Sequence, residues 1–306
     1  MKLQALLTFA LMLIAVESHA QYGSLPEFNY GARGLALGQS AMISSRDALA
    51  TAWNPASACS VERFTTTFAR VGLAGQADLY SLGAMLPLRQ RGTLGVSYFR
   101  LITADIALVD EYSNLTGTAN FTQEHLLLTY SRALSRSWAL GANAKFVWQS
   151  FTPKFASGPE NVGIDLGVIY RAPAAHVLTR DLAFGFAIDN LVQPSLKLDK
   201  VREYLPREYR FILEKSIQHG EHRFLAVANL GAHEKTWRSG TEVQSRFGME
   251  YSHRRLPSLR VGLHDNKMDI GFGVQFRALV LDYARIAMPA YEGSVSKHAW
   301  SLSCRL

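Results

Sequence analysis

From about residue 61 to residue 306, apolar and polar residues alternate along most of the chain, in runs separated by short polar or glycine-containing stretches. A period of two puts successive side chains on opposite faces of an extended strand, so the pattern predicts β-strands. Fourteen runs have this pattern, at Glu62–Leu73, Asp78–Leu88, Thr93–Leu101, Thr122–Ala133, Ser137–Phe151, Val162–Ala172, Leu182–Leu191, Glu208–Ile217, His222–His233, Thr241–His253, Leu259–His264, Asp269–Ala278, Leu279–Ala287 and Lys297–Leu306. The count is even, as a single-chain barrel requires if both of its ends lie on one side.

The two faces of these runs differ in composition. In the run 162–172, one face carries Ile164, Leu166, Val168 and Tyr170, and the other carries Gly163, Asp165 and Gly167. The runs 182–191 and 269–278 repeat this pattern, with Gly185, Gly271 and Gly273 on the small face. One apolar face and one small or polar face is typical of a transmembrane antiparallel β-barrel. Glycine weakens a strand unless another backbone approaches closely, so the inward glycines indicate a segment inside the barrel, although they also allow strand coiling.

The connections alternate in length. If the N-terminus is periplasmic, the periplasmic turns fall near 89–92, 134–136, 173–180, 218–221, 254–257 and 277–279, and most are short. The outward loops fall near 102–121, 152–161, 192–207, 234–240 and 288–296, and most are long. This asymmetry is expected of an outer-membrane barrel.

The stretch from Gly31 to Ala56 does not alternate; it is rich in glycine and alanine at its start and then has the composition of one short helix. Ser44, followed three residues later by Asp47, suggests a capping box at the start of one short helix, and Pro55 is expected to end that helix. We predict that residues 21–60 form a helical plug, or hatch, inside a barrel of residues 61–306. An N-terminal helix packed on another kind of all-β domain is the alternative.

Residues 1–20 have the pattern of a secretory signal peptide, with Lys2, an apolar run and a small residue, Ala20, before the cleavage site. Cleavage there would leave Gln21 as the new N-terminus. The apolar run is short for a bilayer-spanning helix, and a retained membrane anchor is the alternative. We therefore expect the protein in the outer membrane of a Gram-negative bacterium.

The plug stretch resembles the N-terminal hatch of FadL-like outer-membrane barrels, and most closely that of the PorV/PorQ family. The matching residues are Gly31, Arg33, Leu37, Gly38, Ala41, Asp47, Asn54, Pro55 and Ala56. Gln39 and Ser57 stand where the family usually has glycine. The end of the chain, from His298 to Leu306, is similar to the last hairpin of these proteins, with Leu306 in place of the usual phenylalanine.

The resemblance implies one of two functions. PorV/PorQ proteins serve type IX protein secretion or surface attachment, and their partners are secreted cargo and secretion-system proteins. FadL-like proteins pass a hydrophobic small molecule across the outer membrane, and such a transporter should have an apolar pocket near the outer mouth. We expect the secretion role, with hydrophobic transport as the alternative.

Polar residues on the small faces are the candidates for a site in the lumen. On the predicted register the main ones are Lys145, Asp165, Asp189, Arg246 and Asp282, and Glu242, Glu250 and Arg260 face the same way. They would form ion pairs that hold the plug or a polar lining for a substrate path. A register slip of one residue would reverse all of these assignments.

Enzyme chemistry and cofactors are not expected. His219 and His222 are the only close histidine pair, and zinc would need further ligands. Ser131 or Ser245 with His125 is an imaginable nucleophile and base, without evidence of pairing in the sequence. No nucleotide-binding glycine loop is present.

The net charge and the two cysteines give further expectations about partners and stability. The net charge is +7, and Lys and Arg are dispersed along the chain. This suggests contact with anionic outer-membrane lipid and lipopolysaccharide, and not with nucleic acid, which calls for a basic patch on a recognisable module. Cys59 and Cys304 begin and end the predicted barrel, where a disulfide would close the seam. Cys304 falls on the outward face with Leu302, whereas Cys59 falls on the face opposite to Phe64 and Phe68, which argues against that bridge.

Overall fold

The computed structural model describes residues 30–40, 43–73, 77–152, 155–159, 161–176, 179–198, 201–234, 240–288 and 295–306. The predicted signal peptide and the first residues of the predicted plug, 21–29, lie outside this set. None of the helices in these ranges is long and apolar enough to cross a bilayer.

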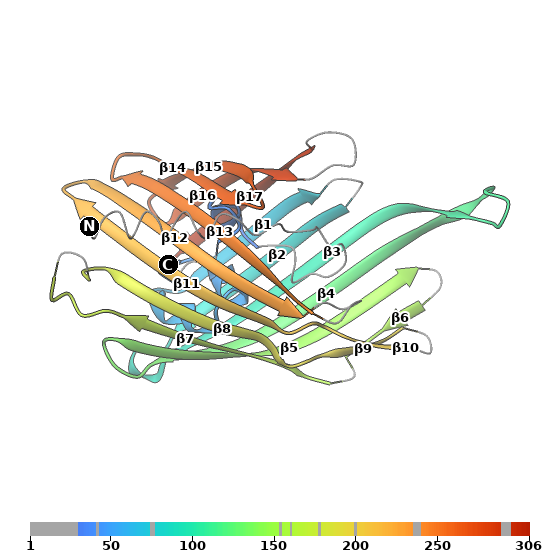
Figure 1. Cartoon of the computed structure of the whole chain (residues 1–306), viewed down its shortest axis with the longest axis horizontal. Coiled ribbons are helices and arrows are strands. Elements are labelled where there is room, and N and C mark those ends of the chain that lie inside the picture. The colour runs from blue at the N-terminus through green and yellow to red at the C-terminus, as the bar shows by residue number, and fades with distance from the viewer. Residues whose placement is uncertain are drawn as a thin grey trace.

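Fourteen antiparallel strands close into a barrel, as the sequence predicts (Figure 1). Most pair with their sequence neighbours, β1 pairs with β17 to close the wall, and β8 pairs with β11. The strands are β1 (Thr65–Leu73), β2 (Ala77–Pro87), β3 (Thr93–Val109), β4 (Leu115–Ala133), β5 (Trp138–Thr152), β7 (Gly163–Arg171), β8 (Leu182–Val192), β11 (Glu208–His219), β12 (His222–Glu234), β13 (Thr241–His253), β14 (Leu256–His264), β15 (Lys267–Phe276), β16 (Leu279–Met288) and β17 (Val295–Arg305).

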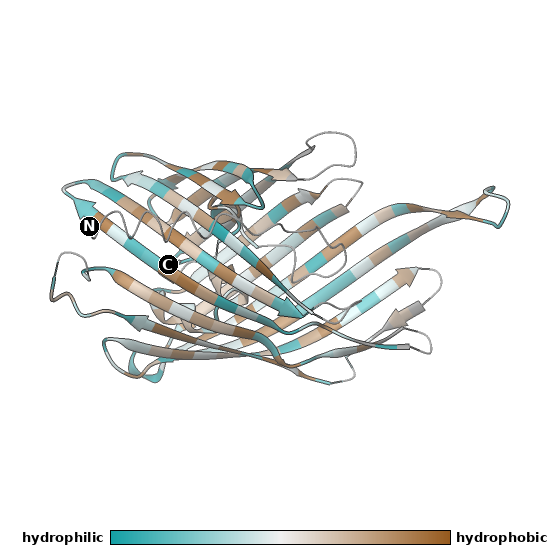
Figure 2. Ribbon diagram, viewed as in Figure 1, coloured by the Kyte–Doolittle hydropathy of each residue, from teal (hydrophilic) through white to brown (hydrophobic). Residues whose placement is uncertain are grey.

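Hydropathy alternates along these strands, as Figure 2 shows. The outward set includes Leu82, Phe211 and Met249, with exposed fractions of 55%, 54% and 61%. Their strand neighbours on the inner face, such as Ser81, Arg210 and Glu250, are buried. An apolar outer surface around a partly polar interior is the arrangement of a membrane barrel.

The two ends of the barrel differ. We call the end with the short connections the turn end, where η4 (Arg89–Arg91) joins β2 to β3, and the opposite end the loop end. The C-terminal residues lie at the turn end, since Arg305 pairs with Thr65 at the start of β1.

Three of the predicted outward loops contain β-strands. The predicted loop 102–121 is mostly the extension of β3 and β4 into one long hairpin, which projects at the loop end (Figure 1). Ile102, Thr103 and Thr118 are β-branched and favour extended backbone. The predicted loop 152–161 includes β6 (Phe155–Ser157), and the predicted loop 192–207 includes the hairpin of β9 (Ser195–Leu198) and β10 (Val201–Tyr204).

The prediction of a single helix in residues 31–56 is wrong. The segment has α2 (Ala32–Ala36) and two 3-10 turns, η2 (Ala48–Ala52) and η3 (Pro55–Ser60). Asp47 is the N-cap of η2, where its side chain accepts a hydrogen bond from the Leu49 backbone, and the Ser44 hydroxyl makes no capping bond. Pro55 begins η3 instead of ending a helix, because the first turn does not need the missing N–H.

Candidate functional site in the lumen

Residues 30–61, here called the N-terminal segment, lie inside the barrel against much of its inner wall. Helix α2 contacts β14 to β17, η2 contacts β1 to β3, and η3 contacts β3, β4, β5 and β7. Most of its residues are buried. The segment therefore crosses the lumen and contacts opposite sides of the wall.

Glycines on the wall make room for this segment, as predicted. A Cβ on Gly262 would lie 1.7 Å from the Gly38 nitrogen, and one on Gly141 would lie 2.4 Å from the Ala56 nitrogen. Of the glycines named from the sequence, Gly167, Gly185 and Gly271 lie close to residues of the segment. Gly163 and Gly273 are exceptions, because Gly163 faces Pro194 at 2.9 Å, from the connection between β8 and β9, and Gly273 faces the wall side chains of Asp282 and Arg260.

Wall side chains satisfy the backbone of the N-terminal segment where it lacks helical partners. Glu214 on β11 accepts hydrogen bonds from the Ile43 and Ser44 nitrogens at 2.9 and 3.2 Å. Asn143 on β5 donates to the Thr51 carbonyl at 3.0 Å. Buried backbone groups need such partners, so these side chains fix the path of the segment.

Asn54 joins the segment to two strands at once. Its Oδ1 accepts a hydrogen bond from the Ala56 nitrogen at 2.9 Å and so caps η3. Its Nδ2 donates to the carbonyls of Val168 on β7 and Phe186 on β8, at 3.3 and 3.4 Å. The side chain fits because Gly167 has no Cβ, which would lie 2.1 Å from Oδ1.

One buried group of charges lies on the β5–β11 side of the lumen, and we call Lys145, Asp165, Asp189 and Arg210 the central cluster. Lys145 Nζ lies 2.9 Å from Asp165, and Arg210 pairs with Asp189. Arg210 also donates to the Trp53 carbonyl at 2.6 Å. The cluster therefore holds the N-terminal segment as well as neutralising charges that would be costly to bury alone.

A local irregularity in β8 positions this cluster. Asn190 has a positive φ of 54°, and the β7–β8 register shifts beside it. Its backbone nitrogen donates to Asp165 at 2.8 Å, and its Oδ1 accepts from Lys145 Nζ at 2.8 Å. The bulge thereby turns a backbone donor and a side-chain acceptor toward the ion pair.

A second buried group lies on the β13–β16 side of the lumen, and we call Arg33, Glu250, Arg260 and Asp282 the latch cluster. Arg33 binds Glu250 through two hydrogen bonds of 2.7 and 2.8 Å. Glu250 also accepts from Arg260 at 2.6 Å, and Arg260 lies 2.7 Å from Asp282. Arg33 belongs to α2 and the other three to the wall, so this cluster ties α2 to β13, β14 and β16.

The remaining residues singled out from the sequence have other places. Arg246 is in neither cluster, and its guanidinium donates to Gln244 on the same strand. Gly31 and Gly38 flank α2 with φ of 80° and 68°, a region that favours glycine. Asp47 caps η2, and burial raises the pKa of its carboxyl.

Two important residues were missed by sequence reasoning, Arg210 and Glu214. Both lie in the predicted strand 208–217 on the parity opposite to Phe211 and Leu213. That parity marks them as inward-facing, so the alternation along the strand was sufficient to identify them as lumen residues. Their partners in the N-terminal segment were not accessible from the sequence, since they lie more than 150 residues away.

The lumen is tightly filled between the central cluster and the segment. A cavity of about 10 Å³ lies among Tyr30, Trp53, His125, Lys145 and Asp189, which is about the size of one water molecule. His125 Nε2 and Asp189 Oδ1 have no hydrogen-bond partner within the described part of the chain. A single water bridging such groups is the most that this space admits.

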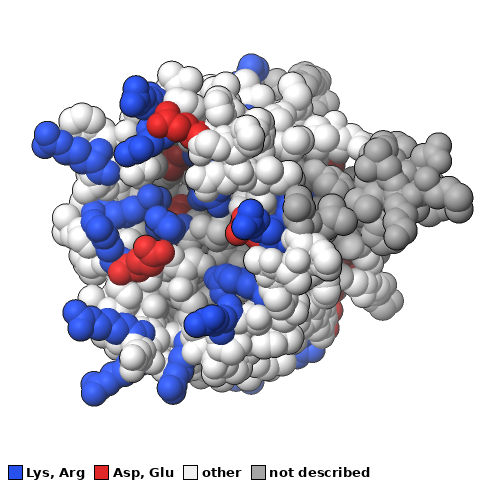
Figure 3. Space-filling model, turned by 90° about the vertical axis from the view of Figure 1, so that its left-hand side faces the viewer, with Lys and Arg blue, Asp and Glu red and all other residues white. Residues whose placement is uncertain are grey.

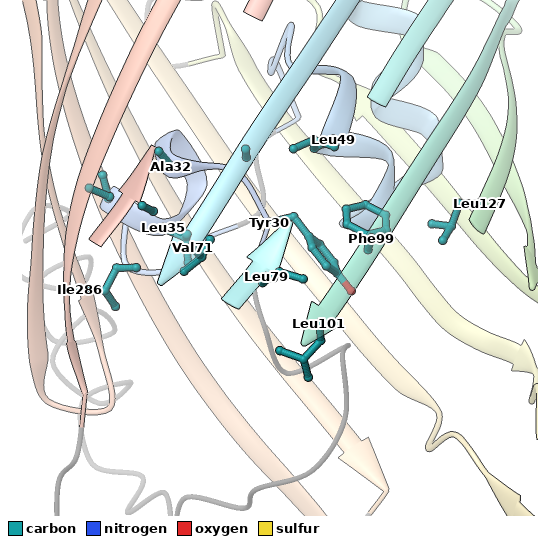
Figure 4. Packing of buried hydrophobic residues seen from close by; sticks show 14 residues of the cluster. Tyr30, Ala32, Leu35, Leu49, Val71, Leu79, Phe99, Leu101, Leu127 and Ile286 are labelled. Atoms are coloured by element: carbon teal, nitrogen blue, oxygen red, sulfur yellow. The ribbon is translucent and has the colours of Figure 1, made fainter. Parts of the chain in front are cut away.

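An apolar surface covers the inner wall of β1 to β4. Val71, Leu79, Phe99, Leu101 and Leu127 are buried there against Tyr30, Leu35 and Leu49 of the segment (Figure 4). The Tyr30 and Phe99 rings have centroids 4.0 Å apart. Leu73 and Phe121, nearer the loop end, are partly buried against the same group. We call these residues the apolar inner wall.

The β9–β10 hairpin packs against the wall at the loop end. Leu196 and Leu205 are buried against Val147 of β5. Asn161 accepts a hydrogen bond from the Ser195 nitrogen at 2.7 Å and donates to the Gln193 carbonyl at 2.9 Å. The connection between β8 and β11 is therefore bonded to the β5–β7 side of the mouth.

The serine and histidine side chains considered as a nucleophile and base are not brought together, and the two cysteines do not form a disulfide. Ser131 and His125 lie on one strand six residues apart, or about 20 Å, and Ser245 alternates to the outer face. Cys59 and Cys304 are both free. Cys59 lies inside beside Ser131, at 2.8 Å, whereas Cys304 shares the outward parity of Leu302 on β17. Within the described ranges, no three His, Cys, Asp or Glu side chains are grouped to hold a metal ion.

Comparison with known proteins shows the fold. No family model and no curated protein sequence matches the chain. Among solved structures, the toluene transporter TodX of Pseudomonas putida is similar with a TM-score of 0.58 and 13% identity, over 90% of this chain and 97% of that one. The CymD monoaromatic hydrocarbon channel is similar with a TM-score of 0.54 and 12% identity, over 91% of this chain and 94% of that one. A Pseudomonas aeruginosa FadL homologue is similar with a TM-score of 0.51 and 12% identity, over 89% and 97%. The chain therefore has the FadL-like barrel fold.

Proposed function

We propose that the chain lies in the outer membrane and passes a hydrophobic small molecule across it. The observation that carries the proposal is the apolar inner wall. Barrel interiors are typically polar, but here Val71, Leu79, Phe99 and Leu101 form a continuous apolar surface, which residues of the N-terminal segment cover. An apolar solute can lie against such a surface without losing hydrogen bonds.

The outer face supports the membrane location. A cross-strand row runs from Tyr283 and Trp300 to Arg70, Tyr80 and Arg100. Toward the turn end, the outward residues that follow on these strands include Leu281, Leu302, Phe68 and Leu82, which are exposed. Aromatic and charged residues at the edge of an apolar band mark a membrane interface.

In this mechanism the N-terminal segment is the plug that closes the path. The latch cluster holds α2, and the central cluster holds η2 and η3, so passage requires one of these attachments to open. Arg33 of α2 is the residue that the segment contributes to the latch cluster, so opening of the Arg33–Glu250 pair would loosen α2.

The secretion role expected from the PorV/PorQ resemblance is less well supported, because the similar solved structures are hydrocarbon and FadL-type proteins. Purification from outer membranes separates the two functions. A stoichiometric hydrophobic compound supports transport, whereas a secreted-protein partner without such a compound supports secretion.

A transport assay tests the proposal directly. Cells with and without the full chain are compared for uptake of a monoaromatic hydrocarbon and of a long-chain fatty acid. Leu101→Asn places an amide in the apolar inner wall and should reduce uptake, whereas Ile102→Asn, on the outer face of the same strand, is the matched control. Equal uptake by the wild type and Leu101→Asn, with both folded, contradicts the proposal.

A further inference from the structure

The turn end of the barrel carries most of the positive charge. Its strand ends and turns hold thirteen Lys and Arg, namely Arg63, Arg89, Arg91, Arg132, Arg136, Arg171, Arg180, Lys215, Arg223, Arg254, Arg255, Arg277 and Arg305, against three acids, Glu62, Asp181 and Glu221. This excess is larger than the net charge of the whole chain, +7. Figure 3 views this end directly, and Lys and Arg side chains stand around the mouth.

A hollow of about 520 Å³ opens at this end, between the end of η3, the start of β1, the β2–β3 turn and the end of β4. Its volume is within the range of small-molecule sites. Three arginines line it, Arg63, Arg89 and Arg132, together with the apolar side chains Phe64 and Leu86. The hollow thus combines cationic and hydrocarbon surface.

In the part of the chain that the structure describes, the three guanidinium groups have no partner of opposite charge. None of them forms an ion pair or a side-chain hydrogen bond with the described residues, and Glu62, the one acidic side chain lining the hollow, pairs with Arg46 at 3.4 Å. Arginine binds phosphate through two parallel hydrogen bonds, and several guanidinium groups around one space favour an anion over a neutral ligand.

The apolar lining selects among anions. Phe64 and Leu86 are exposed by 37% and 47%, and Leu86 alternates to the outward face of β2 with Leu82. The hollow therefore continues from the mouth to the outer surface of the wall. A free anion would use only the arginines, whereas an anion that carries hydrocarbon would contact both surfaces.

We infer that this hollow is a binding site for the headgroup of an anionic phospholipid, with its phosphate among Arg63, Arg89 and Arg132 and its glycerol and first acyl carbons on Phe64 and Leu86. The inference takes from the proposed function only the membrane location, which puts the turn end at the headgroups of the inner leaflet. It does not depend on transport.

The test measures lipid binding to the full chain in detergent by native mass spectrometry, with phosphatidylglycerol, phosphatidylethanolamine and inorganic phosphate as probes. Arg89→Gln with Arg132→Gln removes two charges from the hollow. Arg254→Gln with Arg255→Gln removes two charges from the same end but outside the hollow, so it is the matched control. Folding of each variant is checked by the heat-dependent gel migration of a closed barrel.

The expected result is that phosphatidylglycerol binds more tightly than the other two probes, that the Arg89/Arg132 variant binds it about tenfold more weakly, and that the control changes binding by less than about twofold. Equal loss in both variants shows general attraction without a site and overturns the inference, as does no loss in either. Inorganic phosphate binding as well as the lipid overturns the lipid assignment. Loss of hydrocarbon uptake in Leu101→Asn tests transport separately, and either result there leaves this inference unaffected.

Discussion

Replacing Glu250 with Gln should release α2 from the wall while the barrel stays closed. The carboxylate binds Arg33 at 2.7 and 2.8 Å and Arg260 at 2.6 Å. The side chains of Glu250 and Arg33 are only 4% and 14% exposed. An amide accepts through one oxygen only and turns its own N–H groups toward a guanidinium, so Arg33 is left buried without its partner.

The magnitude follows from this burial. Breaking a buried ion pair by removing one partner costs about 3–5 kcal/mol, which corresponds to roughly a 10²- to 4 × 10³-fold change in a local opening equilibrium. Arg260 keeps Asp282 as a partner, so the wall itself loses less. The cost therefore falls on the attachment of α2.

Amide hydrogen exchange of the full chain in a bilayer measures this opening. We expect exchange across residues 32–39 to accelerate by about 10²-fold or more, with no change in β3 to β5. Glu62→Gln is the control, because its pair with Arg46 also ties the segment to the start of the barrel but is exposed by 74% and 54%. An exposed pair contributes about 1 kcal/mol or less. Unchanged exchange in Glu250→Gln, or the same acceleration in Glu62→Gln, would refute the reasoning.

Three further predictions concern single sites. Gly167→Ala puts a Cβ 2.1 Å from Asn54 Oδ1, so η3 must shift, and exchange in residues 55–60 should rise; normal protection there would contradict the close fit. Burial raises the pKa of the Cys59 thiol, so less thiolate is present at pH 8 than for an ordinary cysteine with a pKa of about 8.5. Alkylation by iodoacetamide, followed by mass spectrometry, should therefore be slow at pH 8 and rise above it, and a rate equal to that of free cysteine would count against burial. Hydrogen bonds from the Asn114 side chain and backbone lower the pKa of Asp110; the turn at the tip of the β3–β4 hairpin is then fully stabilised above the unfolded pKa of about 3.9 and loses that stabilisation as pH falls through the lower folded value. Amide exchange at Asn114, corrected for intrinsic rates, should rise only in that acidic range, and Asp110→Asn should remove the pH dependence.

The barrel itself was largely predictable. Alternation with a period of two is a local property of the sequence, and an outer surface of Leu, Val and Phe requires apolar surroundings whatever the details of the interior. Both the count of fourteen strands and the facing of Lys145, Asp165 and Asp189 follow from it. Strand ends at the loop end were less predictable, because the long β3–β4 hairpin leaves the apolar band and loses the strict alternation.

The path of the N-terminal segment was not predictable in detail. Short sequences rich in Ala and Gly have weak preferences, and the segment adopts three separate turns because Asn143, Arg210 and Glu214 on the wall satisfy its backbone at fixed points. These side chains lie far away in sequence, so no local pattern reports the contact.

The sequence by itself therefore determined the strands, their two faces and the closed wall, since each depends on residues near one another in the chain. Only the tertiary structure decided which charges meet. Arginines that are dispersed in the sequence gather at the turn end because every second connection returns there, and Arg33 reaches Glu250 because the segment folds back into the lumen. Contacts of this kind depend on which strands face one another across the closed barrel, and the alternation of residues along the chain does not specify that.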